Sequence, residues 1–93
     1  MRLHETERQA IIQAIRSADP DAAVYLFGSR VDDGAKGGDI DLLVLSRKID
    51  LMTKLAILSR LHQQLGEQKI DLAVYPDLSR PFARLAVKQG MPL

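Results

Sequence analysis

The residues best placed to do chemistry are three aspartates at the starts of two apolar segments. Asp39 and Asp41 open the segment 39–45, and Asp71 is the second residue of the segment 70–75. Side chains alternate along a strand, so Asp39 and Asp41 share one face, with their Cα atoms about 6 to 7 Å apart. Unpaired carboxylates in such places are costly unless a hard divalent cation neutralises them. The pattern therefore predicts a Mg²⁺ site.

The elements around the aspartates explain how they would meet. Residues 51–65 form a predicted helix long enough for a parallel crossover, which sets the starts of strands 39–45 and 70–75 side by side. Only a short loop separates the earlier strand 22–27 from strand 39–45, so we expect that pair to be antiparallel. The end of strand 22–27 then lies beside the aspartates.

A glycine-serine turn follows strand 22–27 and is suited to phosphate binding. Gly28 lets the backbone approach an anion, and Ser29 can cap a short helix whose N–H groups point outward. Arg30 and Lys36, in the glycine-rich stretch that follows, are candidates for phosphate contact. The alternative is that they are solvated loop cations, which is favoured more for Lys36 than for Arg30.

The remaining pattern predicts the fold class: α/β, with a small mixed sheet of about three strands flanked by helices. Helices are expected over 5–18, 51–65 and 81–89, with Asp50 as an N-cap and Gly66 as a C-terminal glycine. Gly90 and Pro92 are interpreted as stop signals. The leucines of the second helix are expected to form its core stripe: Leu51, Leu55, Leu58, Leu61 and Leu65.

Composition narrows the class of protein. At 93 residues, 46% hydrophobic and 27% charged, the chain is expected to be one domain, 1–93, and neither disordered nor membrane-spanning. The absence of cysteine fits a reducing cytoplasm. A net charge of +1 with scattered basic residues gives no nucleic-acid footprint, so nucleic acid is a disfavoured partner.

Two other features receive structural interpretations. Asp19-Pro20-Asp21 has the same spacing as the paired aspartates but lies in a proline turn, where turn and capping chemistry is expected. His62 has no second histidine or cysteine at ligand spacing, so we expect a packing or surface role for it.

The combined order of motifs resembles the DNA polymerase beta-like nucleotidyltransferase superfamily. The residues that carry this resemblance are Gly28-Ser29-Arg30, then Gly38-Asp39-Ile40-Asp41-Leu42-Leu43-Val44, and a later strand aspartate, Asp71. The chain is most similar to the minimal single-domain bacterial members, which are often encoded with an all-helical HEPN partner as antitoxin and toxin. The resemblance implies that Gly28 and Ser29 hold the triphosphate, and that Asp39 and Asp41 bind two metal ions with Asp71 as the third carboxylate.

The activity implied is in-line attack of an acceptor hydroxyl on the α-phosphate of a nucleoside triphosphate, with ATP favoured and pyrophosphate leaving. Asp71 could bind the catalytic metal or take the hydroxyl proton, and the sequence leaves both roles open. The acceptor would lie on a protein partner. The alternative is a non-catalytic, antitoxin-like binding module that neutralises a HEPN-type partner by contact.

Overall fold

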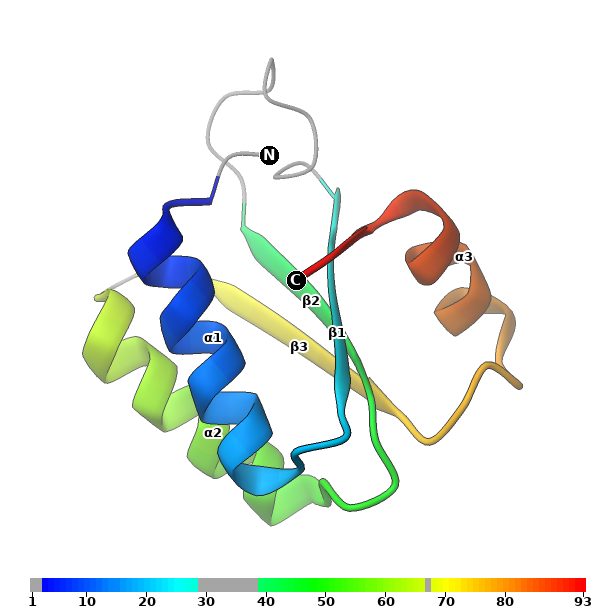
Figure 1. The fold of residues 1–93 in the computed structure, drawn as a ribbon, viewed down its shortest axis with the longest axis horizontal. Helices are drawn as coiled ribbons and strands as arrows, with labels where there is room; N and C mark the ends of the chain where they lie inside the picture. Colours follow the sequence, from blue (N-terminus) through cyan, green and yellow to red (C-terminus); the bar gives the residue numbers. More distant parts are fainter. Residues whose placement is uncertain (1–2, 29–38, 67) are drawn as a thin grey trace.

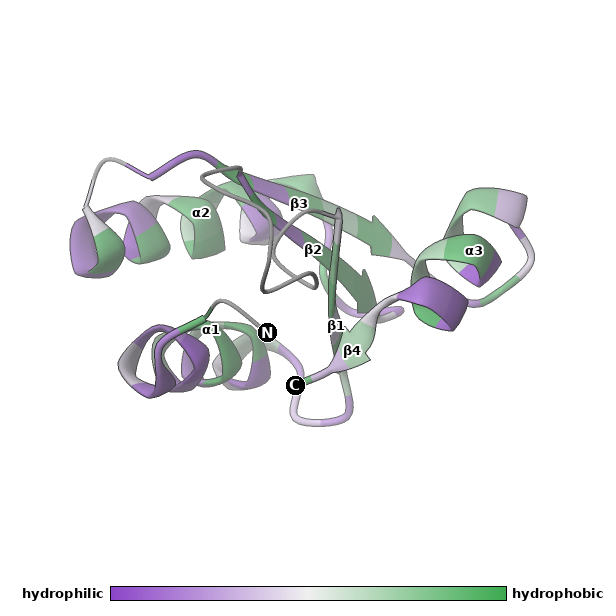
Figure 2. Cartoon of the chain, turned by 90° about the horizontal axis from the view of Figure 1, so that it is seen from above, coloured by the Kyte–Doolittle hydropathy of each residue, from purple (hydrophilic) through white to green (hydrophobic). Residues whose placement is uncertain are grey.

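The computed structural model describes residues 3–28, 39–66 and 68–93, in which a sheet is covered by two helices on one face and a third helix on the other (Figures 1 and 2). The elements are, in chain order, α1 (Glu5–Ala18), β1 (Ala23–Phe27), β2 (Ile40–Leu45), α2 (Leu51–Leu65), β3 (Ile70–Tyr75), α3 (Pro81–Gln89) and β4 (Met91–Pro92). The mixed α/β fold class predicted from the sequence is confirmed, and so are the three expected helices.

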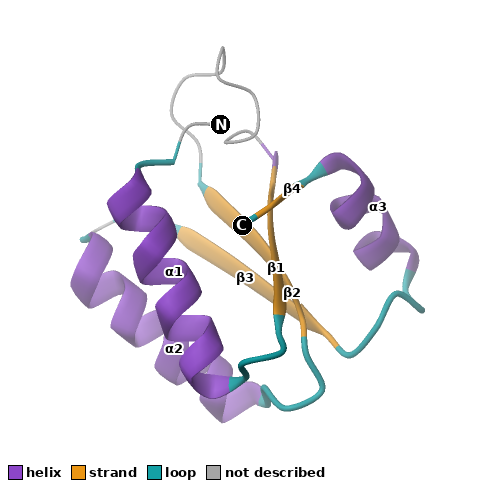
Figure 3. Cartoon of the chain, in the orientation of Figure 1, coloured by secondary structure: helices purple, strands orange, loops and turns teal. Residues whose placement is uncertain are grey.

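The strand order in the sheet is β3-β2-β1-β4. β1 runs antiparallel to β2, and β2 runs parallel to β3, as the loop length and the crossover helix predict. Strands β2 and β3 consequently start at the same end of the sheet (Figure 3).

A fourth strand was missed by the sequence interpretation. The stop signals at Gly90 and Pro92 predict only the end of the last helix, but Met91 and Pro92 pair with Leu26 and Tyr25 of β1. Proline lacks an N–H, and it is tolerated here because β4 is the terminal strand of the sheet.

The alternation of side chains along β2 separates two apolar layers. Ile40, Leu42 and Val44 pack in the larger core with α1 and α2, whereas Leu43 packs with Ala83 and Ala86 of α3. Because Asp41 has the same parity as Leu43, its side chain lies on the face of the sheet that α3 covers. The carboxylates and α3 therefore share one face of the sheet.

The predicted core stripe of α2 is wrong in its first half. Leu51 and Leu55 are 66% and 49% exposed, and the buried residues of the helix are Ile57 and Leu61. Apolar residues form two overlapping stripes on α2, and only the stripe that faces α1 and the sheet is covered. The predicted ends are confirmed, because the Asp50 side chain accepts a hydrogen bond from the Thr53 N–H at 2.8 Å and Gly66 ends the helix with φ 80°.

No helix within residues 3–28, 39–66 and 68–93 combines the length and the apolar character needed to cross a membrane.

Candidate metal and nucleotide site

The register of the parallel strands brings the three predicted aspartates together. Asp41 of β2 lies directly opposite Asp71 of β3, and Asp39 immediately precedes β2. One carboxylate oxygen from each residue lies within 4.8 Å of the others. Asp39 and Asp41 are half-buried and Asp71 is exposed, so this carboxylate cluster opens to solvent on one side.

The electrostatics of the cluster are unfavourable in the absence of a cation. The pKa of Asp41 is raised above its ordinary value of 3.8, first by burial and then by the negative charge of Asp71 and a hydrogen bond to it. The charge of Asp39 raises the pKa further, and that of Lys69 lowers it. The cluster therefore favours the gain of positive charge, as a proton or as a metal ion.

The sequence interpretation overlooked Lys69 as a neighbour of these carboxylates. Its Nζ lies 3.5 Å from Oδ2 of Asp39, and its backbone carbonyl accepts a hydrogen bond from the Ile40 N–H at 3.0 Å. The sequence contains a signal for this pairing: Lys69 directly precedes β3 and Asp39 directly precedes β2, so parallel strands in this register place the two residues side by side. The Lys69 side chain is 70% exposed, so the ion pair is screened by water and weak.

Gly28 lies against the carboxylate cluster. It follows Phe27, which pairs with Asp41 across the antiparallel strands. Gly28 has φ +80°, and a Cβ there would collide with Oδ2 of Asp41. Glycine is thus required both by the backbone conformation and by the Asp41 side chain. The phosphate contact that the sequence predicts at Gly28 stays a prediction, and the neighbour of Gly28 in the structure is the Asp41 carboxylate.

The other predicted phosphate-binding residues, Ser29, Arg30 and Lys36, and the glycine-rich loop 32–38 lie outside the described residues.

A hollow of about 440 Å³ adjoins two of the aspartates. Besides Asp41 and Asp71, its lining includes a half-buried lysine, Lys54 of α2, and the exposed ring of Phe82 of α3. The sequence interpretation assigned neither Lys54 nor Phe82 to the site. They belong to α2 and α3, and the sequence does not specify where these two helices lie against the strands.

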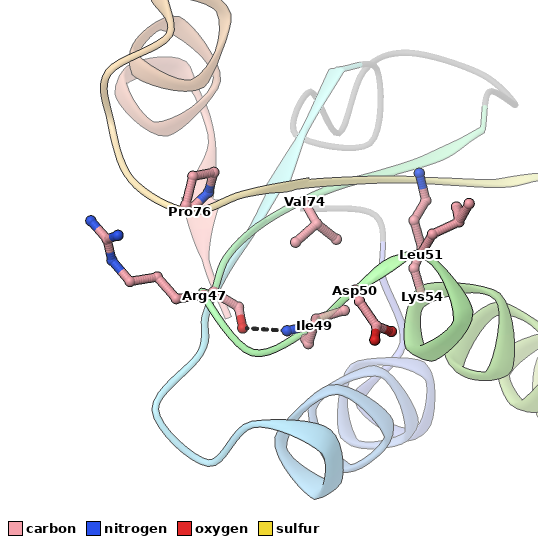
Figure 4. A pocket seen from close by; sticks show the side chains of 8 residues that line it. Arg47, Ile49, Asp50, Leu51, Lys54, Val74 and Pro76 are labelled. Atoms are coloured by element: carbon pink, nitrogen blue, oxygen red, sulfur yellow. Dashed lines mark hydrogen bonds between the residues drawn. The ribbon is translucent and has the colours of Figure 1, made fainter.

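A second hollow, also of about 440 Å³, lies at the opposite ends of β2 and β3 (Figure 4). Its lining includes Arg47, Asp50, Lys54 and Val74. Asp50 there is the N-cap of α2, and the pKa of its carboxyl is lowered by hydrogen bonds to Thr53. The carboxylate in this hollow thus caps a helix and has a lowered pKa, whereas the pKa of Asp41 in the carboxylate cluster is raised.

Three carboxylates within reach of one another form a donor set that a hard cation such as Mg²⁺ or Mn²⁺ prefers. The raised pKa of Asp41 points the same way, because the carboxylates repel one another until a cation neutralises them. The residues present therefore fit a divalent metal ion.

A parallel β2-β3 pair, an antiparallel β1 and carboxylates at the strand starts are consistent with a polymerase beta-like nucleotidyltransferase fold. Residues 9–93 match the family described as "Polymerase beta, Nucleotidyltransferase". The chain belongs to that family, which indicates nucleotidyl transfer and a nucleoside triphosphate substrate. A search of curated proteins found no significant match.

Proposed function

We propose that this chain is a magnesium-dependent nucleotidyltransferase that transfers a nucleoside monophosphate from a triphosphate, with ATP favoured, to an acceptor hydroxyl. The observation that carries the proposal is the carboxylate cluster, whose oxygens lie within 4.8 Å of one another in a member of this family. A cluster that served only the fold would have hydrogen-bond donors or cations to match its charge, whereas the cation paired with it among the described residues is Lys69, in a weak ion pair with Asp39.

Asp39 and Asp41 are assigned to hold two metal ions, with Asp71 as the third carboxylate. Bound divalent ions would stabilise negative charge on the attacking and leaving oxygens. Asp71 is exposed, so an acceptor can reach it. The acceptor oxygen forms a bond to the α-phosphorus, the bond to the bridging oxygen breaks, and pyrophosphate leaves. The proton of the acceptor goes to Asp71 or to water.

The phosphates are assigned to the turn that begins at Gly28, with Ser29, Arg30 and Lys36 as further contacts. Lys54 is a supporting candidate, since it lines the hollow that also contains Asp41 and Asp71. An amine beside a triphosphate would offset part of its charge.

We further propose that residues 1–93 act as one minimal domain in the cytoplasm, and that the acceptor lies on an all-helical HEPN-type protein for which the chain is the antitoxin. Exposed apolar side chains lie on two opposite sides of the sheet, and either group could contact such a partner: Leu51, Met52 and Leu55 on α2, and Leu78, Phe82 and Leu85 just before or within α3. The same exposed side chains favour the rival function, a binding module that neutralises the partner by contact alone.

The deciding experiment is transfer of label from α-labelled ATP to the purified helical partner. Wild type with magnesium should label the partner, and Asp39→Asn should not. Asp21→Asn, which alters the other pair of aspartates, should transfer normally. If wild type and Asp39→Asn neutralise the partner equally and no label appears, the binding module is the correct function.

A further inference from the structure

Phe82 is a large apolar residue that lies outside the buried core clusters. It is the second residue of α3, and α3 packs on the sheet through Ala83 and Ala86, which are 0% and 4% exposed. The side chain of Phe82 remains 45% exposed. Leu85, one turn further along, is 51% exposed but does not line the hollow beside the aspartates.

Two neighbouring rings fix the position of Phe82. Its ring centroid lies 5.6 Å from that of Phe27, with the planes at 78°, and 6.1 Å from that of Tyr75. The contact with Phe27 is edge-to-face, which is a preferred arrangement of aromatic rings, and the contact with Tyr75 is tilted at 44°. The ring is therefore held in place on one side and open on another.

Phe82 lines the same hollow of about 440 Å³ as Asp41 and Asp71. Phe27 also lines it; it pairs with Asp41 on the neighbouring strand, and its ring contacts that of Phe82. The lining of one hollow thus combines carboxylates with a partly exposed aromatic ring.

We propose that Phe82 is the platform on which the base of the nucleoside triphosphate stacks. This inference rests on the proposed function, since it requires the phosphates to lie at the carboxylate cluster. The base is joined to the α-phosphate through one ribose, so it must lie in or beside the same hollow. Phe27 and Tyr75 are positioning residues that hold the ring of Phe82.

The platform also predicts which triphosphates bind best. Stacking on an aromatic ring tolerates every base, because each base has a π-face, and it increases with the area of the ring system. We expect purine triphosphates to bind more tightly than pyrimidine triphosphates, with only modest discrimination between ATP and GTP.

The test compares ATP with inorganic tripolyphosphate, which has the phosphates and lacks the base. In calorimetry with magnesium, wild type should bind ATP more tightly than tripolyphosphate. Phe82→Ala should weaken ATP binding by about 5- to 150-fold, the range expected for one stacked base, and leave tripolyphosphate binding unchanged. Phe82→Trp should retain ATP binding, and its indole fluorescence should be quenched by ATP but not by tripolyphosphate.

Two variants serve as controls. Leu85→Ala removes an equally exposed side chain of the same helix and should change neither affinity. Phe82→Leu keeps apolar packing but loses the aromatic face. It should also weaken ATP binding and leave tripolyphosphate binding unchanged, so it replaces Phe82→Ala if that variant fails to fold.

The outcomes separate the two proposals. If wild type binds ATP and tripolyphosphate equally well, or if the Phe82 variants weaken both ligands equally, the platform is refuted and the nucleotidyltransferase proposal stands. If the Phe82 variants weaken only binding of a protein partner, the ring belongs to that interface instead. If wild type binds neither ligand, the proposed function fails and the platform fails with it.

Discussion

Aspartates gather at both ends of this sheet, and the two groups differ in what neutralises them. Asp19 is buried just after α1, accepts a hydrogen bond from Ser46 Oγ at 2.6 Å, and accepts another from the Asp21 N–H at 3.0 Å. Asp77, after β3, pairs with Arg47 at 3.0 Å. Within residues 3–28, 39–66 and 68–93, the carboxylates of Asp39, Asp41 and Asp71 instead lie close to one another, with one weak ion pair from Asp39 to Lys69.

The pKa directions follow this difference. Hydrogen bonds, led by that from Ser46, lower the pKa of Asp19, and those from Ser79 lower that of Asp77. Burial and neighbouring carboxylates raise that of Asp41. The lesson is that spacing alone does not identify a metal site: 19–21 and 39–41 have the same spacing, and the surrounding donors distinguish them.

The largest expected effect is the loss of metal binding in Asp41→Asn. This change removes one donor and one negative charge, so magnesium affinity and transfer should fall by more than about 100-fold. The free protein should be equally stable or slightly more stable, since like charges no longer oppose each other. Metal titration and thermal melts measure both. A lower Tm in every buffer would assign Asp41 to the fold.

Asp19→Asn should show the opposite pattern. The carboxylate oxygens that accept from Ser46 Oγ and from the Asp21 N–H are replaced by an amide, so we expect Tm to fall by about 5 °C. Magnesium affinity should stay at the wild-type value. The matched control is Asp21→Asn, an exposed residue of the same turn, which should leave Tm nearly unchanged. Equal effects at positions 19 and 21 would contradict the buried role of Asp19.

The pH dependence of stability should have opposite signs at the two ends. Asp41 has a raised pKa in the folded state, so its contribution is most favourable below 3.8 and is lost as the pH rises through the raised value. Asp19 has a lowered pKa, so its contribution is present above 3.8 and is lost as the pH falls through the lowered value.

Melts across acidic and neutral pH without metal test these signs. The Tm advantage of Asp41→Asn over wild type should grow as the pH rises above 3.8. The Tm deficit of Asp19→Asn should shrink as the pH falls below 3.8. Parallel profiles for the two variants would mean that the two ends do not differ electrostatically.

The smallest effect is expected for Lys69→Gln. The substitution removes the positive charge that forms a weak, exposed ion pair with Asp39 and competes with the metal ion. Magnesium should therefore bind about twofold more tightly at low salt. The difference should vanish at high salt. Lys48→Gln, at the other end of the sheet, is the control and should have no effect. Weaker metal binding in Lys69→Gln would mean that Lys69 supports the cluster.

The sequence predicted the three helices, the first three strands and the meeting of the aspartates, because side-chain alternation and crossover connections follow general rules. Alternation fixed the face of Asp41, and the crossover helix fixed the parallel pairing with β3. The exposure of Leu51 and Leu55 could not be predicted from the sequence. Hydrophobic periodicity shows that α2 is amphipathic, but it does not show how much of the helix the sheet covers. The strand at Met91 and Pro92 was too short to give a pattern.

The tertiary neighbours of the site depend on distances between elements, which no local pattern specifies. Phe82 and Lys54 line the hollow beside Asp41 only because α3 and α2 flank the sheet there. The ion pair between Lys69 and Asp39 could have been predicted from the sequence, because it follows from the register of β2 and β3.

The pairing of Asp41 with Asp71 joins positions 30 residues apart in the chain, on neighbouring parallel strands. Such non-local pairing forms slowly during folding, and a slip of one residue would turn Asp71 to the opposite face of the sheet. A ligand that needs all three carboxylates can therefore recognise only the chain whose strands are aligned correctly. Binding at the cluster would select the native alignment over slipped ones and would act mainly by slowing unfolding.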